Sequence, residues 1–320
     1  GPPAMGALRK VSLFTLWYVA NVVYNDTNKT LLRGLRLPLT MASLQLGIGL
    51  LFIVPLWLSG LRAPPRLRPA QLRSLLVPAL VHAAGQMVTV ASLGTGSLGF
   101  VNAVKSAEPL STAALGAFLF GDLLPWQVNA CLLPICAGVA LASSADLHAF
   151  NYECFVFAML SNLFFSLRGV LTKRVLAAST PATALGPSNL LAVVTALAFL
   201  MTIPLALAVE GPTLEIEWTR ALSTGKQPGL ALLLHLLLSG ASFHLYNEAS
   251  FAALGLVHPL THAVGNAAKR PLLVLYSVAR GGATMRGTTV AGSGTAVGGL
   301  IMYALAKQLY DGPGKKGKSE

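Results

Sequence analysis

The sequence predicts an all-α integral membrane protein with ten transmembrane helices, arranged as two inverted repeats of five helices. Three observations predict this fold: a low content of charge, ten apolar segments, and cations that lie between those segments. Of the 320 residues, 54% are hydrophobic and only 11% are charged, and the mean hydropathy is +0.66. Soluble domains carry about 25% charged residues, so a water-soluble fold of this size could not cover its surface.

Ten stretches are long and apolar enough to cross a bilayer, which requires roughly 20 residues per helix. They cover residues 11–31, 38–60, 72–94, 97–120, 125–144, 151–176, 183–209, 229–253, 257–279 and 287–308. The stretch from Glu210 to Gln227 is predicted to be the longest loop. In the last segment, the Gly-rich run from Gly292 to Gly299 is expected to permit close packing of helices.

The cations lie mostly between or beside the apolar segments, as is typical of membrane-protein loops. The net charge is +12. Ten spans place both termini on one side, and the loops on that side hold most of the cations: Arg9, Lys10, Arg62, Arg66, Arg68, Arg73, Lys173, Arg174, Lys307 and the basic tail. This bias supports an even number of spans. The same distribution indicates a lipid bilayer as partner and argues against nucleic acid.

A weak internal similarity suggests that the chain has two halves. Residues 91–93 read Ala-Ser-Leu, residues 249–251 read Ala-Ser-Phe, and a leucine follows each run five positions later. We therefore expect one transmembrane domain, with a first repeat of residues 1–148, a second repeat of residues 149–310 and a basic tail of residues 311–320. Five is odd, so the repeats would have opposite orientations, and transporters of this design bind substrate near the midplane.

Three basic residues lie well inside predicted spans: Lys105, Lys269 and Arg270. An uncompensated cation at mid-bilayer costs roughly 2.5–3.5 kcal/mol, so such residues need a partner, a wet cavity or a function. Arginine offers a planar fork that matches phosphate or carboxylate, and lysine offers a compact charge. Together they predict a site for a small polyanion; the alternative is snorkelling from helix ends. Pro271 is expected to distort the helix that carries the pair.

Three runs of residues resemble the plastid phosphate translocators, a family of the drug/metabolite transporter superfamily. Residues 259–270 read Pro-Leu-Thr-His-Ala-Val-Gly-Asn-Ala-Ala-Lys-Arg, which matches the family's diagnostic Pro-Leu-Thr-His-Ala-Val-Gly-Asn-x-x-Lys-Arg pattern. Residues 102–109, Asn-Ala-Val-Lys-Ser-Ala-Glu-Pro, are similar to its Lys-Ala-x-Glu-Pro run. Residues 21–29, Asn-Val-Val-Tyr-Asn-Asp-Thr-Asn-Lys, are similar to its Asn-x-x-x-Asn-x-x-Asn-Lys segment. The resemblance covers nearly the whole chain.

The resemblance implies a strict antiporter that exchanges inorganic phosphate for phosphorylated metabolites by alternating access around a central cationic site. Three-carbon compounds are expected: triose phosphate, 3-phosphoglycerate and phosphoenolpyruvate. The resemblance assigns substrate binding to six residues: Thr89, Lys105, Lys269 and Arg270 for the phosphate, and Tyr246 and Gln86 for the rest of the substrate. It also implies a multi-pass protein of a plastid-type membrane, either the chloroplast envelope or the apicoplast. We expect a monomer without a cofactor.

Gln86 departs from the family pattern. Members that prefer triose phosphate usually carry histidine at this position, and members that prefer phosphoenolpyruvate tend to carry asparagine. An amide can hydrogen-bond a hydroxyl or a carboxylate but cannot take a charge. We therefore expect a broad or mixed specificity.

Three further charged residues lie within the predicted spans. Asp26 is expected to pair with Lys29 or another buried cation, since buried charges are usually paired. Glu108 and Arg168 are expected to form a structural charge network around the site.

Two other functions are compatible with a polytopic membrane protein. A nucleotide-sugar transporter of the same superfamily would share the ten-helix pattern, but the Lys-Arg run argues against it. An intramembrane enzyme acting on a lipid phosphate would need a nucleophile or a metal. The sequence contains no HExxH motif, no GxSxG motif and no Gly-rich phosphate loop. Its histidines and three cysteines lack metal-binding spacing, so we expect neither an enzyme nor a metal site.

Overall fold

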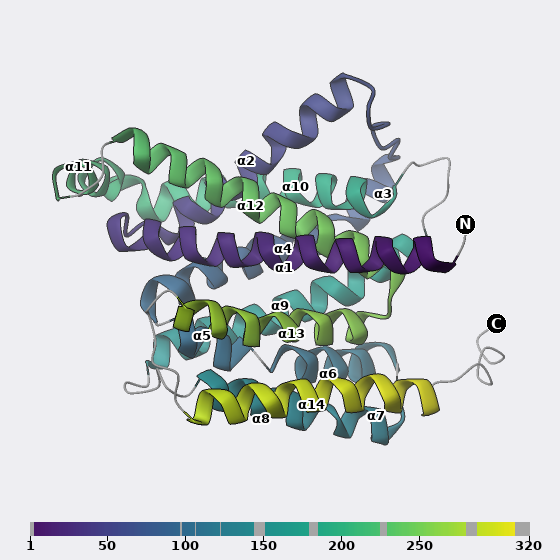
Figure 1. Ribbon diagram of the computed structural model, residues 1–320. Coiled ribbons are helices and arrows are strands. Elements are labelled where there is room, and N and C mark those ends of the chain that lie inside the picture. Colours follow the sequence, from purple (N-terminus) through teal and green to yellow (C-terminus); the bar gives the residue numbers. More distant parts are fainter. Residues whose placement is uncertain are drawn as a thin grey trace. The chain divides into compact units, whose positions relative to one another are not determined.

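The computed structural model describes residues 3–96, 98–105, 107–121, 123–143, 151–178, 185–224, 229–279 and 287–310. Every regular element in these ranges is a helix (Figure 1), as the sequence predicts. In chain order the elements are α1 (Pro3–Gly34), α2 (Pro38–Leu58), α3 (Pro69–Ser74), α4 (Leu76–Thr95), α5 (Leu98–Lys105), α6 (Glu108–Phe120), α7 (Trp126–Ala130), α8 (Leu132–Ser143), α9 (Tyr152–Ala177), α10 (Pro187–Glu210), the 3₁₀ helix η3 (Gly211–Thr213), α11 (Leu214–Thr224), α12 (Gly229–Leu256), α13 (Pro259–Ala279) and α14 (Gly287–Tyr310).

Five stretches of helix within the described ranges are long and apolar enough to cross a membrane. They are Pro38–Leu58, Pro69–Thr95, Tyr152–Ala177, Pro187–Ser223 and Gly229–Leu256. Two shorter apolar stretches, Trp126–Leu141 and Val290–Ala306, add to these. The chain is therefore a multi-pass helical protein, and the count of ten spans stays a prediction.

Two of the predicted spans are not single helices. In segment 97–120, α5 ends at Lys105 and α6 begins at Glu108. Pro109 lies in the first turn of α6, where its missing N–H is not needed, so a new helix begins there. In segment 125–144, α7 ends at Ala130 and α8 begins at Leu132.

The predicted loop between Glu210 and Gln227 is largely helical, so that prediction was wrong. Helix α11 covers Leu214 to Thr224, with Glu215 and Glu217 in its first turn. Carboxylates there interact favourably with the positive end of the helix dipole. The Glu210 carboxylate accepts hydrogen bonds from the backbone N–H groups of Leu39 (2.8 Å) and Thr40 (2.7 Å) and so caps α2.

The chain forms two compact units that are discontinuous in sequence. The first unit holds Gly1–Thr95 and Leu167–His258, and the second holds Gly96–Ser166 and Pro259–Glu320, so α9 contributes to both. This division concerns packing and leaves the repeat boundary as a prediction. That boundary, between residues 148 and 149, and the tail of residues 311–320 both lie outside the described residues.

In the first unit, α1 packs along α12, and α2 packs against α4, α10 and α12 (Figure 1). One apolar cluster joins Leu75 and Ala79 to Leu190 and Val194 of α10 and to Phe251 of α12. Between membrane helices such contacts act through van der Waals packing and not through the hydrophobic effect.

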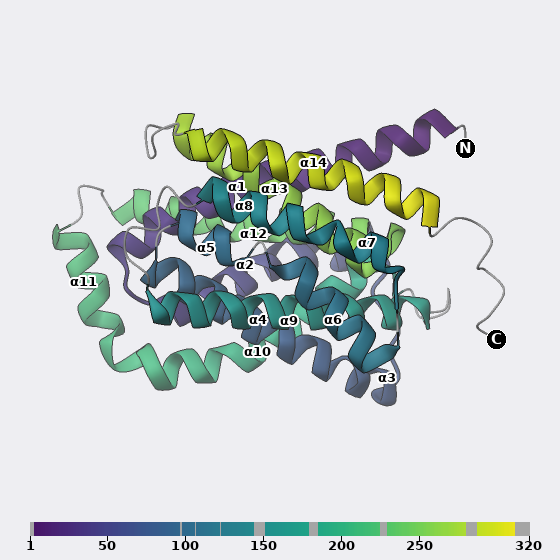
Figure 2. The same cartoon turned by 90° about the horizontal axis from the view of Figure 1, so that it is seen from below.

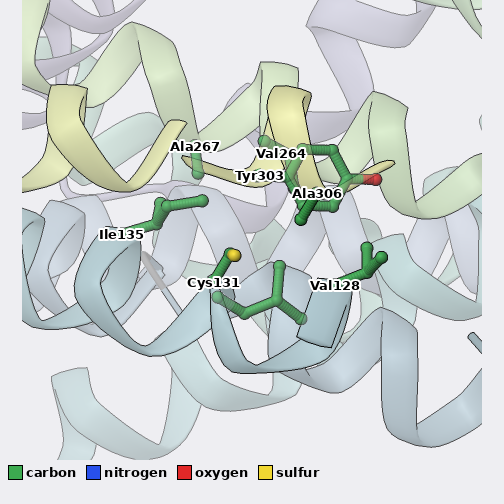
Figure 3. Close-up of a cluster of buried hydrophobic side chains, with 8 residues drawn as sticks. Val128, Cys131, Ile135, Val264, Ala267, Tyr303 and Ala306 are labelled. Carbon is green, nitrogen blue, oxygen red and sulfur yellow. The ribbon is translucent and has the colours of Figure 1, made fainter. Parts of the chain in front are cut away.

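In the second unit, α14 lies alongside α8, as Figures 1 and 2 both show, and α13 packs against both helices. The cluster in Figure 3 joins these three helices and α7, and its members are Val128, Cys131, Leu132, Ile135, Val264, Ala267, Tyr303 and Ala306. The packing fixes the face of α13 that precedes Lys269 and Arg270.

Small residues bring α8 and α14 together, which confirms the prediction for the Gly-rich run. A Cβ atom on Gly299 would lie 2.8 Å from the backbone nitrogen of Ile135. A Cβ atom on Gly138 would collide with the backbone of Ala296 and would lie 2.7 Å from the carbonyl oxygen of Gly292. Close backbone approach of this kind is available only to glycine.

Candidate functional site

The three predicted cations of the site all belong to the second unit. Lys105 is the last residue of α5, and Lys269 and Arg270 lie in α13. All three side chains are buried, with residue exposures of 9%, 7% and 2%. Helix α13 continues through Pro271 to Ala279, so the proline does not end the helix there.

An ion pair connects the two sequence motifs that carry these cations. The Nη2 atom of Arg270 donates to Oε2 of Glu108 at 3.2 Å, and Nη1 donates to Oδ1 of Asn102 at 3.2 Å. Glu108 is itself only 4% exposed. Its carboxylate also accepts a hydrogen bond from the amide of Asn266, one helical turn before Arg270. Glu108 thus pairs with a buried cation, as expected.

Hydroxyl groups fix the backbone around Glu108. The side chains of Thr112 and Ser166 both donate to the Glu108 carbonyl oxygen, at 3.0 and 3.2 Å, and Thr112 also donates to Ser166 at 2.9 Å. Buried polar groups that are satisfied in this way form a rigid network. The start of α6 is therefore held in place, and with it the carboxylate that orients Arg270.

Helix α9 supplies the partners of Lys105. The Nζ atom of Lys105 hydrogen-bonds the hydroxyl of Ser161 and lies 5.1 Å from the ring centroid of Phe165. Asn162 donates to the carbonyl oxygen of Val104 at 2.9 Å. An ammonium group over an aromatic face is attracted by the ring quadrupole. These contacts hold Lys105 at the break between α5 and α6.

We call Lys105, Glu108, Lys269 and Arg270 the charged network. Three cations and one carboxylate give it a formal charge of +2. A buried cluster with excess positive charge favours an anion, and a guanidinium with a nearby ammonium suits phosphate oxygens. Within the described residues, the Nε atom of Arg270 is buried and makes no hydrogen bond. The cluster can therefore bind a small dianion.

The other three predicted site residues, Thr89, Gln86 and Tyr246, belong to the first unit. Thr89 is buried on α4 and donates to the carbonyl oxygen of Gly85 at 2.7 Å. Gln86 is fully buried, and its amide donates to the Tyr24 hydroxyl at 3.1 Å. Tyr246 on α12 is half-buried, with its ring 5.2 Å from that of Tyr24. Their contact with substrate stays a prediction.

Arg168 lies in a different environment from Glu108. Its Nη1 atom bonds Nδ1 of His82 at 2.8 Å and donates to Oδ1 of Asn247 at 3.2 Å. Its guanidinium also lies 5.1 Å from the ring centroid of Phe251. All these residues belong to the first unit, whereas Glu108 belongs to the second. Lys29 donates to the carbonyl oxygen of Leu93 at 2.7 Å, and the pairing of Asp26 stays a prediction.

Sequence reasoning missed Asn102, Ser161 and Asn266 as members of the site. A usable signal existed for two of them. Asn266 precedes Arg270 by four residues and Asn102 precedes Lys105 by three, and both spacings place side chains on one face of a helix. Within the described residues, no group of three or more His, Cys, Asp or Glu side chains could hold a metal ion.

Comparison with known proteins identifies relatives along nearly the whole chain. The sequence model of the Triose-phosphate Transporter family matches residues 8–304. Phosphoenolpyruvate/phosphate translocator 2, chloroplastic, of Arabidopsis thaliana is 32% identical over 314 residues, which are 97% of this chain and 80% of that protein. The chloroplastic triose phosphate/phosphate translocator of Pisum sativum is 31% identical over 322 residues, which are 98% of this chain and 76% of that protein.

A solved crystal structure shares the fold. It covers 96% of this chain and 99% of its own chain, with a TM-score of 0.61 and 16% sequence identity. The relatives named above carry both kinds of substrate name at nearly the same identity, so similarity does not choose between the substrates.

Proposed function

The chain belongs to the Triose-phosphate Transporter family, and on that premise we propose that it is a strict antiporter exchanging inorganic phosphate for three-carbon phosphate esters. The membrane would be that of a plastid-type organelle, the chloroplast envelope or the apicoplast, and the working unit a monomer. The charged network carries this proposal, because its excess charge of +2 matches a phosphate dianion.

In the proposed complex, Lys105, Lys269 and Arg270 bind the phosphate group. Glu108 neutralises one positive charge and orients the Arg270 guanidinium through the 3.2 Å contact. The family resemblance adds Thr89 as a phosphate contact, with Tyr246 and Gln86 contacting the carbon chain.

The charge balance also accounts for obligatory exchange. Without substrate, the network keeps two uncompensated positive charges in a space of low dielectric, and closing around them is costly. A bound dianion removes the excess charge, so the loaded carrier closes and crosses between its two open states. The empty carrier does not, and net transport without a counter-substrate is suppressed.

The experiment is exchange in liposomes preloaded with phosphate. Lys269→Ala and Arg270→Ala should each lower phosphate/phosphate exchange by on the order of 100-fold, since each removes a buried charged contact. Arg66→Ala is the matched control, because Arg66 is exposed in the link between α2 and α3. Normal exchange by both site variants would overturn the proposal.

Competition in the same assay tests the substrate class. Triose phosphates should inhibit phosphate uptake, and nucleotide sugars should not. Strong inhibition by nucleotide sugars alone would favour the other branch of the superfamily. Recovery of every substrate unaltered would argue against an enzyme.

A further inference from the structure

A second polar network is buried in the first unit. It contains Tyr24 and Asn28 of α1, Gln45 of α2, Gln86 of α4 and Ser239 of α12. We call these five residues the amide network. Tyr24 is 2% exposed and the other four are fully buried. None of the five carries a charge, which distinguishes this network from the charged one.

The amide hydrogens of the network are used in a fixed order. Nε2 of Gln86 donates to the Tyr24 hydroxyl oxygen at 3.1 Å and to Oε1 of Gln45 at 2.7 Å. Nε2 of Gln45 donates to Ser239 Oγ at 2.9 Å and to Asn28 Oδ1 at 3.2 Å. Nδ2 of Asn28 donates to the Tyr24 hydroxyl oxygen at 3.0 Å.

This order fixes the direction of the Gln86 amide. An amide flip of Gln86 alone would place two carbonyl oxygens, its own and that of Gln45, 2.7 Å apart. A joint flip of Gln86, Gln45 and Asn28 would present two amide oxygens to Tyr24, whose hydroxyl has only one hydrogen to donate. The arrangement with both Gln86 hydrogens donated is the one that satisfies every contact.

One acceptor is left over. Oε1 of Gln86 is buried and makes no hydrogen bond within the described part of the chain. A buried carbonyl oxygen without a donor is unfavourable, so a group that brings a hydrogen is favoured at this position. A hydroxyl supplies such a hydrogen, whereas a carboxylate brings only oxygens, which the amide oxygen repels.

We propose that Gln86 accepts a hydrogen bond from a hydroxyl on the carbon chain of the substrate, and that Gln45 and Tyr24 are positioning residues that fix its direction. The proposal rests on the proposed antiport function and narrows its substrate class. Three-carbon phosphates with a free hydroxyl, such as 3-phosphoglycerate and dihydroxyacetone phosphate, are preferred over phosphoenolpyruvate, which has none.

The first test uses the unaltered protein and a matched pair of inhibitors. 3-Phosphoglycerate and 3-phosphooxypropanoate both carry the phosphate and carboxylate, and only the former has the 2-hydroxyl. In phosphate-loaded liposomes, 3-phosphoglycerate should inhibit phosphate uptake with an inhibition constant about tenfold lower or better. Dihydroxyacetone phosphate should likewise inhibit more strongly than phosphoenolpyruvate. Equal inhibition within each pair would overturn the inference.

The second test changes the positioning residues. Gln45→Met removes the acceptor of Gln86 and frees its amide to rotate, and Tyr24→Phe removes the other acceptor. In both variants the ratio of the two inhibition constants should move toward one. Each ratio is measured within a single variant, so a general loss of activity or of folded protein cancels. Gln127→Met is the control, because Gln127 lies in α7 of the second unit and should leave the ratio unchanged.

The outcomes separate the two proposals. Absence of phosphate exchange by the unaltered protein would sink the antiport function itself. Phosphate exchange with an unchanged inhibitor ratio in both Gln45→Met and Tyr24→Phe would sink only the assignment of these positioning residues. A ratio that collapses in Gln127→Met as well would overturn the same assignment.

Discussion

The two buried networks differ in what they offer a ligand. The charged network of Lys105, Glu108, Lys269 and Arg270 supplies excess positive charge, which attracts any small dianion over a range of orientations. The amide network around Gln86 supplies one directed acceptor and no charge. Charge gives affinity, and a directed neutral group gives discrimination between similar substrates, because a buried polar atom left unpaired is costly. The difference suggests that phosphate binding and substrate choice can be altered separately.

Breaking the ion pair in the charged network should have the largest effect. Arg270→Met leaves the Glu108 carboxylate buried without its cationic partner at 3.2 Å. The free energy of unfolding should fall by about 3–5 kcal/mol, and exchange should be lost. Thermal unfolding in detergent micelles and exchange in liposomes measure the two effects.

A double variant separates stability from function in this network. Glu108→Gln combined with Arg270→Met removes both charges, so much of the stability should return while exchange stays lost. Arg62→Met is the control, because its pair with Glu248 at 2.8 Å is partly exposed, with side chains 25% and 22% accessible. Such a pair contributes about 0–1 kcal/mol. A double variant that exchanges phosphate normally would contradict the role given to the charged network.

The apolar packing behind the charged network gives a smaller effect. Gly299→Ala places a Cβ atom 2.8 Å from the backbone nitrogen of Ile135, so α8 and α14 must move apart. We expect a loss of about 1–3 kcal/mol in the free energy of unfolding. Gly298→Ala is the control in the adjacent position, since a Cβ atom there has no atom within 4 Å. Equal unfolding midpoints for the two variants would show that the close approach is not needed.

The sequence predicted the fold class and the three buried cations because both depend on composition along the chain. Apolar length predicts helices, and a basic residue within such a stretch is visible without any structure. The ion pair between Glu108 and Arg270 was not predictable, since it joins residues 162 positions apart. The break after Lys105 was missed because an apolar segment with a short turn keeps its mean hydropathy.

The direction of Gln86 shows a further limit of sequence reasoning. The residue type indicates that an amide is present, and from that alone a broad specificity was expected. Which end of the amide is available depends on Tyr24 and Gln45, which are 62 and 41 positions away along the chain. Helix α11 was missed for a different reason: its eleven residues, with two glutamates in the first turn, contain no long apolar window.

A pair of buried serines provides the finest test of the comparison between the networks. Ser161 bonds the ammonium of Lys105 in the charged network, and Ser239 accepts from the amide of Gln45 in the neutral one. Hydrogen bonds to charged groups are worth about 1.5–3 kcal/mol and neutral ones about 0.5–1.5 kcal/mol, so Ser239→Ala should cost roughly 1 kcal/mol of stability. Ser161→Ala should raise the KM for phosphate and leave the ratio of inhibition constants for 3-phosphoglycerate and 3-phosphooxypropanoate unchanged. Ser239→Ala should do the reverse, because it loosens Gln45 and with it the direction of Gln86. If both variants moved the same quantity by similar amounts, charge and direction would not be separable in this carrier.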